Sequence, residues 1–189
     1  DFLELNGTAY IVMELVRGET LEDRIKRQGK LSADEVLAIL WPMLDGLEQV
    51  HKAGFLHRDM TAIFTPGYAA AEQMTAAKQG PWTDIYGLSA TLYNAITGAP
   101  PPPAFDRMLD DDYQPLSKVA PAGFAPNLLI GLDAGLAVRA TERPQTIAGW
   151  RGLLSMTGGA TGDATQRVGA DPNATVMAPR AAASAPQPA

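Results

Sequence analysis

The 189-residue sequence predicts a mainly α-helical fold that begins with a short β-hairpin. Apolar residues recur at helical spacing through 33–52, which predicts an amphipathic helix. The run IYGLSATLYNAIT at 85–97 is apolar on more than one face and predicts a central, buried helix. The hairpin is predicted from the turn signal Asn6-Gly7, which separates two short apolar runs.

The first two helices follow the hairpin closely. Thr20 precedes the helical sequence LEDRIKRQ, and Gly29 ends it. Ser32 and Glu35 stand at the two positions of a capping box, which predicts the start of the next helix. Pro42 lies inside that helix and is expected to kink it, because proline removes one backbone donor.

The second half of the sequence predicts the central helix and two shorter ones. Thr83-Asp84 is the expected start of the central helix, and Gly98 is its expected C-cap. The prolines at 100–103 predict a stiff connector. Further helices are expected at 126–138 and 146–155.

The composition changes near residue 156. From there the chain consists mostly of Ala, Gly, Pro and Thr, which bury too little apolar surface to offset the entropy of ordering. The predicted organisation is therefore a strand hairpin and hinge at 1–18, a helical domain at 19–155 and a disordered tail at 156–189. Thr165 and Thr175 in the tail are either plain linker residues or phospho-acceptor or docking sites.

The overall composition excludes several classes of protein. A net charge of -6 and no basic stripe argue against a nucleic-acid binder. The absence of cysteine excludes disulfides and thiolate metal sites. We find no membrane-spanning run and no leader, so the sequence is expected to be cytoplasmic. The chain opens on Asp1 inside a predicted strand, which suggests a fragment.

Five motifs follow one another in the chain, and together they resemble bacterial Hanks-type serine/threonine protein kinases over about 1–155. The motifs are YIVMELVRGETLEDRI at 10–25, VHKAGFLHRD at 50–59, TPGYAAAEQ at 65–73, WTDIYGLSATLYNAITG at 82–98 and RATERPQT at 139–146. The resemblance implies a protein-kinase-like large (C-terminal) lobe, joined to a hairpin and hinge remnant of the small lobe.

The resemblance implies an adenine site in the first motif. Met13 takes the gatekeeper position, Glu14 and Val16 take the positions of the hinge hydrogen bonds, and Glu19 lies near the ribose. ATP and Mg²⁺ are the cofactors expected for the family. From the residues alone, apolar strand positions and a solvated glutamate explain the same pattern.

The resemblance also implies the catalytic positions. Asp59 matches the catalytic base, and Arg58 matches the residue that engages the activation segment. Thr65 matches the threonine that contacts the catalytic aspartate in serine/threonine-specific kinases. His57 takes a position with a packing role, and a core histidine after an apolar pair would look the same.

Three further positions are structural in the family. Glu72 is expected to form a buried ion pair with Arg143, which would tie the docking loop to the lower helices. Asp84 is expected to cap the backbone of the catalytic loop. Unrelated surface charges and an ordinary N-terminal aspartate remain the alternatives from the residues alone.

One internal segment of the family is absent. Only five residues, Met60 to Phe64, separate the HRD triplet from Thr65. The K-P-x-x-N run and the D-F-G triplet, which carry the magnesium ligands in the family, therefore have no counterpart here. We expect no metal site, because Asp59 alone is a poor ligand set and Asp110 to Asp112 are expected to be solvated on a distal loop. The chain as given is therefore expected to be inactive in phosphoryl transfer.

Three interpretations of the junction at 60/61 remain open. The chain is a partial, inactive kinase domain whose family phosphorylates protein serine and threonine, or it is a pseudokinase-like module that binds protein partners. In the third interpretation the junction is an artefact, and the real protein is an intact kinase.

Overall fold

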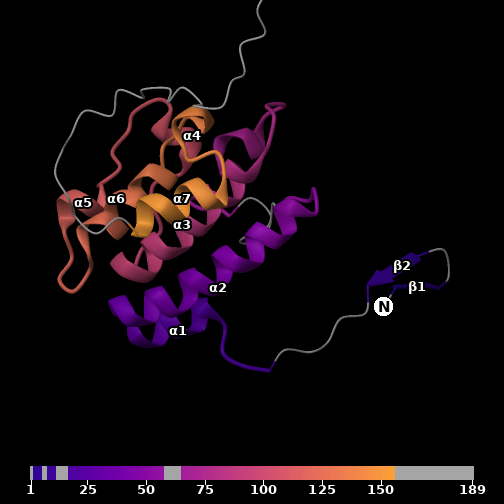
Figure 1. Ribbon diagram of the computed structural model, residues 1–189, viewed down its shortest axis with the longest axis horizontal. Coiled ribbons are helices and arrows are strands. Elements are labelled where there is room, and N and C mark those ends of the chain that lie inside the picture. Colours follow the sequence, from indigo (N-terminus) through magenta and orange to yellow (C-terminus); the bar gives the residue numbers. More distant parts are fainter. Residues whose placement is uncertain (1, 6–7, 12–16, 58–64, 156–189) are drawn as a thin grey trace, which may run out of the picture. The chain divides into compact units, whose positions relative to one another are not determined.

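The structure is a computed structural model that describes residues 2–5, 8–11, 17–57 and 65–155 (Figure 1). Strands β1 (Phe2–Leu5) and β2 (Thr8–Ile11) pair antiparallel, with Leu5 opposite Thr8. This register confirms the hairpin predicted around residues 6–7, which themselves lie outside the described part. The tail predicted at 156–189 also lies outside it.

The first two helices have the predicted caps. In α1 (Leu21–Gln28) the side chain of Thr20 accepts a hydrogen bond from the backbone N–H of Asp23, and Gly29 ends the helix with φ 83°. Before α2 (Ala33–Lys52), Ser32 and Glu35 form both hydrogen bonds of the capping box. These side chains satisfy backbone N–H groups that have no partner inside the helix.

Helix α2 packs with one apolar face against the core. Four apolar residues of this face are buried, whereas Met43 is exposed and Val50 is half-buried. The buried positions are Val36, Leu40, Leu44 and Leu47. Pro42 lies on the exposed side, and α2 continues past it as one helix to Lys52.

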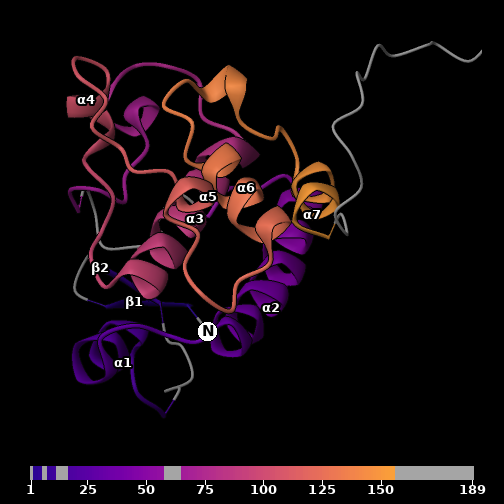
Figure 2. The ribbon, with the colours of Figure 1, turned by 90° about the vertical axis from the view of Figure 1, so that its left-hand side faces the viewer.

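Helix α3 (Pro81–Thr97) is the centre of the helical lobe, as its sequence predicts. Twelve of its 17 residues are buried, and it packs against both α2 and α6 (Pro126–Gly135) (Figures 1 and 2). It begins at Pro81, slightly before the predicted Thr83-Asp84, because Pro81 is suited to the first turn. Gly98 ends it in the left-handed region with φ 82°.

Short elements complete the lobe. Helix α6 packs against α7, α3 and α5, and it stops three residues before the predicted 138. These elements are η1 (Ala71–Met74), α4 (Ala104–Arg107), α5 (Leu116–Val119), α6 (Pro126–Gly135), η2 (Ala140–Glu142) and α7 (Ile147–Ser155). Among the described helices, none is long and apolar enough to cross a membrane.

Candidate functional site

The loop that carries Thr65 is held against the connector that follows α3. The carbonyl of Thr65 accepts a hydrogen bond from the backbone N–H of Tyr68, which closes a turn. Gly67 has φ +90°, and a Cβ atom there would lie 2.6 Å from the carbonyl oxygen of Pro101. Only glycine fits this approach without displacing backbone. The Tyr68 hydroxyl also accepts a hydrogen bond from Asn94 of α3 at 2.7 Å, so the loop is fixed at two points.

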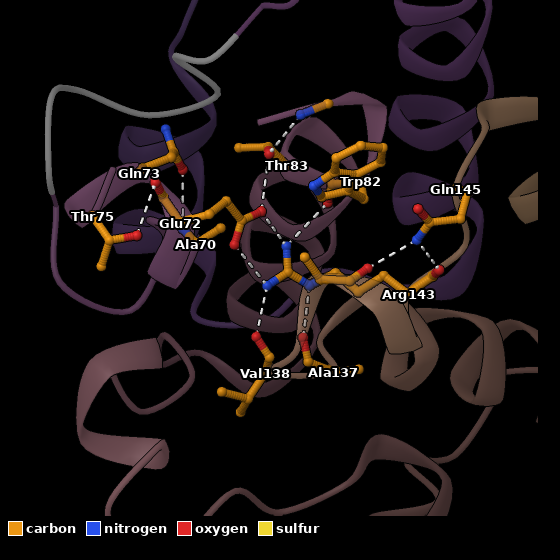
Figure 3. Close-up of polar contacts among 12 residues, drawn as sticks. Ala70, Glu72, Gln73, Thr75, Trp82, Thr83, Ala137, Val138, Arg143 and Gln145 are labelled. Carbon is orange, nitrogen blue, oxygen red and sulfur yellow. Dashed lines mark hydrogen bonds and ion pairs between the residues drawn. The ribbon is translucent and has the colours of Figure 1, made fainter. Parts of the chain in front are cut away.

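Glu72 and Arg143 form a bidentate, buried ion pair, as the resemblance predicts (Figure 3). Nη1 of Arg143 lies 2.6 Å from Oε1 of Glu72, and Nη2 lies 3.1 Å from Oε2. The side chain of Arg143 is 0% exposed and that of Glu72 is 4% exposed. The pair joins two segments that lie 71 residues apart in the sequence.

Backbone carbonyls use the remaining donors of Arg143. Nε donates to Ala137, Nη2 donates to Val138 and Nη1 donates to Trp82 (Figure 3). Together with the two bonds to Glu72, these contacts use all five N–H groups of the guanidinium. The charge is buried without an unpaired donor, which is the condition for tolerating it in the core.

Helix α3 supplies two further contacts to this ion pair. The hydroxyl of Thr83 donates to Oε1 of Glu72 at 2.9 Å. The guanidinium of Arg143 lies over the ring of Tyr86, 4.7 Å from its centroid, in a cation–π contact. Burial raises the pKa of Tyr86. The ion pair thus joins η1, α3 and the segment after α6.

Asp84 joins α3 to the end of α2 and to the segment that leads into the predicted catalytic loop. Its Oδ2 atom lies 2.7 Å from Nε2 of His51 and accepts the backbone N–H of His57 at 2.9 Å. The side chain of Asp84 is fully buried and that of His51 is 10% exposed. This contact reaches the backbone of His57, but residues 58–64 lie outside the described part, so the cap expected for the catalytic loop stays a prediction. The side chain of His57 is exposed, so the core packing expected for it is absent from the structure.

Replacing Asp84 by alanine is expected to lower the free energy of unfolding by about 2–3 kcal/mol, because the substitution leaves buried donors without an acceptor. Chemical denaturation monitored by circular dichroism measures this change. Asp84→Asn keeps one carbonyl oxygen and should lose less. Asp34→Asn, at an exposed position of α2, is the control and should change stability by less than about 0.5 kcal/mol. Equal losses for the asparagine variants at 84 and 34 would contradict the buried-acceptor role.

Several predicted site residues cannot be placed relative to this arrangement. Met13, Glu14, Val16, Arg58 and Asp59 lie outside the described residues, so the adenine site and the contact between Thr65 and the predicted base stay predictions.

Glu19 is described, and it lies on the exposed surface in an ion pair with Arg27. The hydrogen bond from Arg27 lowers the pKa of this carboxyl group. A role at the ribose stays a prediction. Within the described ranges no group of three or more potential ligands lies close enough to hold a metal ion.

The sequence reasoning missed the partners of the motif residues. Thr83 and His51 stand within the quoted motifs, but nothing in their spacing showed that they would contact Glu72 and Asp84. Arg107 was also missed: its buried guanidinium donates to the carbonyl of Leu136 and to Asp111. Asp111 was expected to be solvated. It is exposed, in agreement with that expectation, and it also forms an ion pair with Arg107 that the sequence did not show.

Comparisons with known proteins show that the chain is similar to protein kinases. The family model described as "Protein kinase domain" matches residues 1–62. The serine/threonine-protein kinase PknE of Mycobacterium tuberculosis is 24% identical over 178 residues, which cover 77% of this chain and 31% of PknE. The hormonally up-regulated neu tumor-associated kinase homolog B of Xenopus laevis is 24% identical over 168 residues, covering 66% of this chain and 27% of that protein.

Solved structures agree with the sequence relatives. The structure described as "PpkA-294 apo form" is 34% identical, with a TM-score of 0.72, and the match covers 82% of this chain and 66% of that chain. The predicted fold class, a kinase-like large lobe with a hairpin remnant, is confirmed. The chain spans less than a third of the length of the two curated relatives.

Proposed function

The chain belongs to the family of bacterial Hanks-type serine/threonine protein kinases, and we propose that it is a partial catalytic domain that does not itself transfer phosphate. The family uses Mg-ATP and acts on hydroxyl groups of protein substrates. Asp59 takes the position of the catalytic base, and Thr65 takes that of its contact. The cytoplasm is the proposed location, in keeping with a sequence without cysteine.

This proposal rests on the small number of residues between the HRD triplet and the TPGY motif. Only Met60 to Phe64 separate HRD from the TPGY motif, so the K-P-x-x-N run and the D-F-G triplet have no counterpart. The alignment with PknE has 178 positions and takes up about 146 residues here, 77% of 189. The difference leaves roughly 30 positions of PknE without a partner in this chain.

The donor set around Asp59 does not fit magnesium. Mg²⁺ prefers an octahedral shell of oxygen ligands, which kinases supply from an asparagine and an aspartate of the missing segments. The five residues after Asp59 contribute no carboxylate and no side-chain amide. Because phosphoryl transfer depends on positioning and charge stabilisation, a base without these ligands does not suffice.

A second function, a pseudokinase-like module that binds proteins, is favoured by the completeness of the described large lobe. Glu72 forms its ion pair with Arg143, and Asp84 contacts His51 and the backbone N–H of His57. The five residues 60–64 can span about 15 Å when extended, so the shortened connection need not disrupt the core. We propose 1–18 as the small-lobe remnant, 19–155 as this module and 156–189 as its tail.

A thermal-shift measurement with Mg-ATP tests the proposed loss of the nucleotide site. We expect no increase in Tm at millimolar Mg-ATP, whereas ligand at a hundredfold excess over Kd would add about 2.7 kcal/mol to stability. An intact bacterial kinase domain serves as the positive control. Transfer of radiolabelled phosphate to a general protein substrate should be equally undetectable for the parent protein and for Asp59→Asn. Transfer that requires Asp59 would contradict the proposal.

Sequencing the coding DNA across codons 60 and 61 separates a genuine junction from an artefact. A segment there that encodes the two missing motifs would replace this proposal with an intact kinase.

A further inference from the structure

A cluster of large apolar side chains is exposed on and after α4. Phe105, Met108 and Leu109 are 52%, 58% and 82% exposed, respectively, and they lie within five consecutive residues. Scattered exposed apolar residues are common, but adjacent ones form a surface whose burial against a partner is favourable. We call these three residues the α4 patch.

A groove begins at the α4 patch. Its volume is about 700 Å³, and Met108 lines it together with small apolar residues from η1, from the segment after η1, from the segment after α6 and from η2. The apolar lining residues are Ala71, Ala77, Met108, Ala137, Val138 and Ala140. The volume lies within the range of pockets that hold small ligands and anchoring side chains. The groove can therefore accept an apolar side chain of a segment that lies across the patch.

The patch stands on an anchored element. Arg107 lies between Phe105 and Met108 in the sequence, and its side chain is buried. Its guanidinium donates to the carbonyl of Leu136 and to Asp111. The same guanidinium lies over the ring of Tyr113, 4.3 Å from its centroid. A fixed element reduces the entropy that a partner must overcome when it binds.

The charges around the patch are predominantly negative. Asp106, Asp110 and Asp112 are exposed and form no ion pair with any other described residue. The two arginines that line the groove have acidic neighbours: Arg107 pairs with Asp111 at 2.8 Å, and Arg139 lies 3.9 Å from Glu142. Three carboxylates without an ion-pair partner among the described residues therefore stand in the same stretch of chain as the apolar patch.

We propose that the α4 patch and its groove dock a segment of a partner protein that combines arginine or lysine with large apolar residues. The apolar residues would cover the patch and enter the groove, and the cationic side chains would face the three carboxylates. Charge complementarity of this kind speeds association and excludes acidic partners. The proposal names the partner chemistry of the binding module and rests on that second function, not on phosphoryl transfer.

Fluorescence anisotropy with synthetic peptides tests the proposal on the full chain. The probe is a fluorescein-labelled amphipathic peptide of arginine, leucine and phenylalanine. One control peptide has glutamate in place of arginine, and a second has serine in place of the apolar residues. We expect both controls to bind at least about tenfold more weakly. We also expect the affinity of the probe to fall as salt screens the carboxylates. Equal binding of the probe and the glutamate control would overturn the proposal.

Matched variants locate the binding. Two double variants are made. One replaces the apolar residues, Phe105→Ser with Leu109→Ser, and the other replaces the acidic residues, Asp110→Asn with Asp112→Asn. Each double variant should weaken binding of the arginine peptide about tenfold or more. Val119→Ser and Asp34→Asn, which change an exposed apolar and an exposed acidic residue elsewhere, serve as controls. Because all these positions are exposed, melting temperatures should stay close to the parent value. If the control variants lose as much affinity for the peptide, the peptide does not bind at the α4 patch, and the proposed location is wrong.

Two alternative partners of the α4 patch, a second copy of the chain and the tail of the same chain, would give different experimental results. Sedimentation that shows self-association abolished by Leu109→Ser would assign the patch to a second copy and overturn the proposal. A photo-cross-linking amino acid at position 109 that captures 156–189 of the same chain would assign the patch to the tail and also overturn it. Detection of Mg-ATP binding or turnover would bear on the proposed loss of activity and leave these peptide results unchanged.

Discussion

Arg143→Ala is expected to lower the free energy of unfolding by about 3–5 kcal/mol, because it leaves the buried carboxylate of Glu72 without its cation. The same change removes the donors to three backbone carbonyls, at Trp82, Ala137 and Val138. Urea denaturation at neutral pH, followed by circular dichroism, measures the loss. We expect the parent and variant curves to differ in midpoint and to share one slope.

A double-mutant cycle separates the ion pair from the other contacts of Arg143. Glu72→Ala alone should also be strongly destabilising, and the double variant should lose less than the sum of the single losses. Arg143→Lys should recover only part of the stability, because lysine has three donors and no planar fork. Arg139→Ala is the control: its side chain is 80% exposed and its acidic neighbour is 3.9 Å away, so the loss should stay within about 1 kcal/mol. Additive losses at 72 and 143 would show that the two residues do not act as a pair.

Trp150→Ala is expected to cost about 3–5 kcal/mol, because it leaves a large cavity between α7 and α6. The side chain is fully buried, and its Nε1 atom donates to the carbonyl of Gly131 at 2.7 Å. Gly131 is itself tightly packed, since a Cβ atom there would lie 2.7 Å from the side chain of Leu154. The surrounding helices therefore have little room to move into the cavity. Thermal or urea denaturation measures the change.

Two variants on the same helix control for this effect. Trp150→Phe keeps an aromatic ring but removes the donor to Gly131, so its loss should be smaller than that of the alanine variant. Leu153→Ala truncates an exposed neighbour and should change stability by only about 0.5 kcal/mol. A loss at position 150 no greater than the loss at 153 would mean that α7 contributes little to the core.

Local patterns were sufficient to predict most helix limits. The hydroxyl groups of Thr20 and Ser32 and the glycines at 29 and 98 mark helix ends by interactions with residues a few positions away. Such contacts are encoded in short stretches of sequence, and a single chain therefore reveals them. Two predictions were less accurate: α6 ends three residues before the predicted position, and the apolar pattern of α2 did not show that Met43 stays exposed.

The sequence by itself determined the family, through the order of five motifs, and the absence of two motifs between Asp59 and Thr65. It also pointed to the pair of Glu72 and Arg143 through the resemblance. Only the tertiary structure decided how that charge is satisfied, since three backbone carbonyls complete the shell of Arg143. It also decided which apolar residues remain uncovered on α4. The physical reason is the same in both cases: these contacts join segments distant in the chain, and no local periodicity records which surfaces meet.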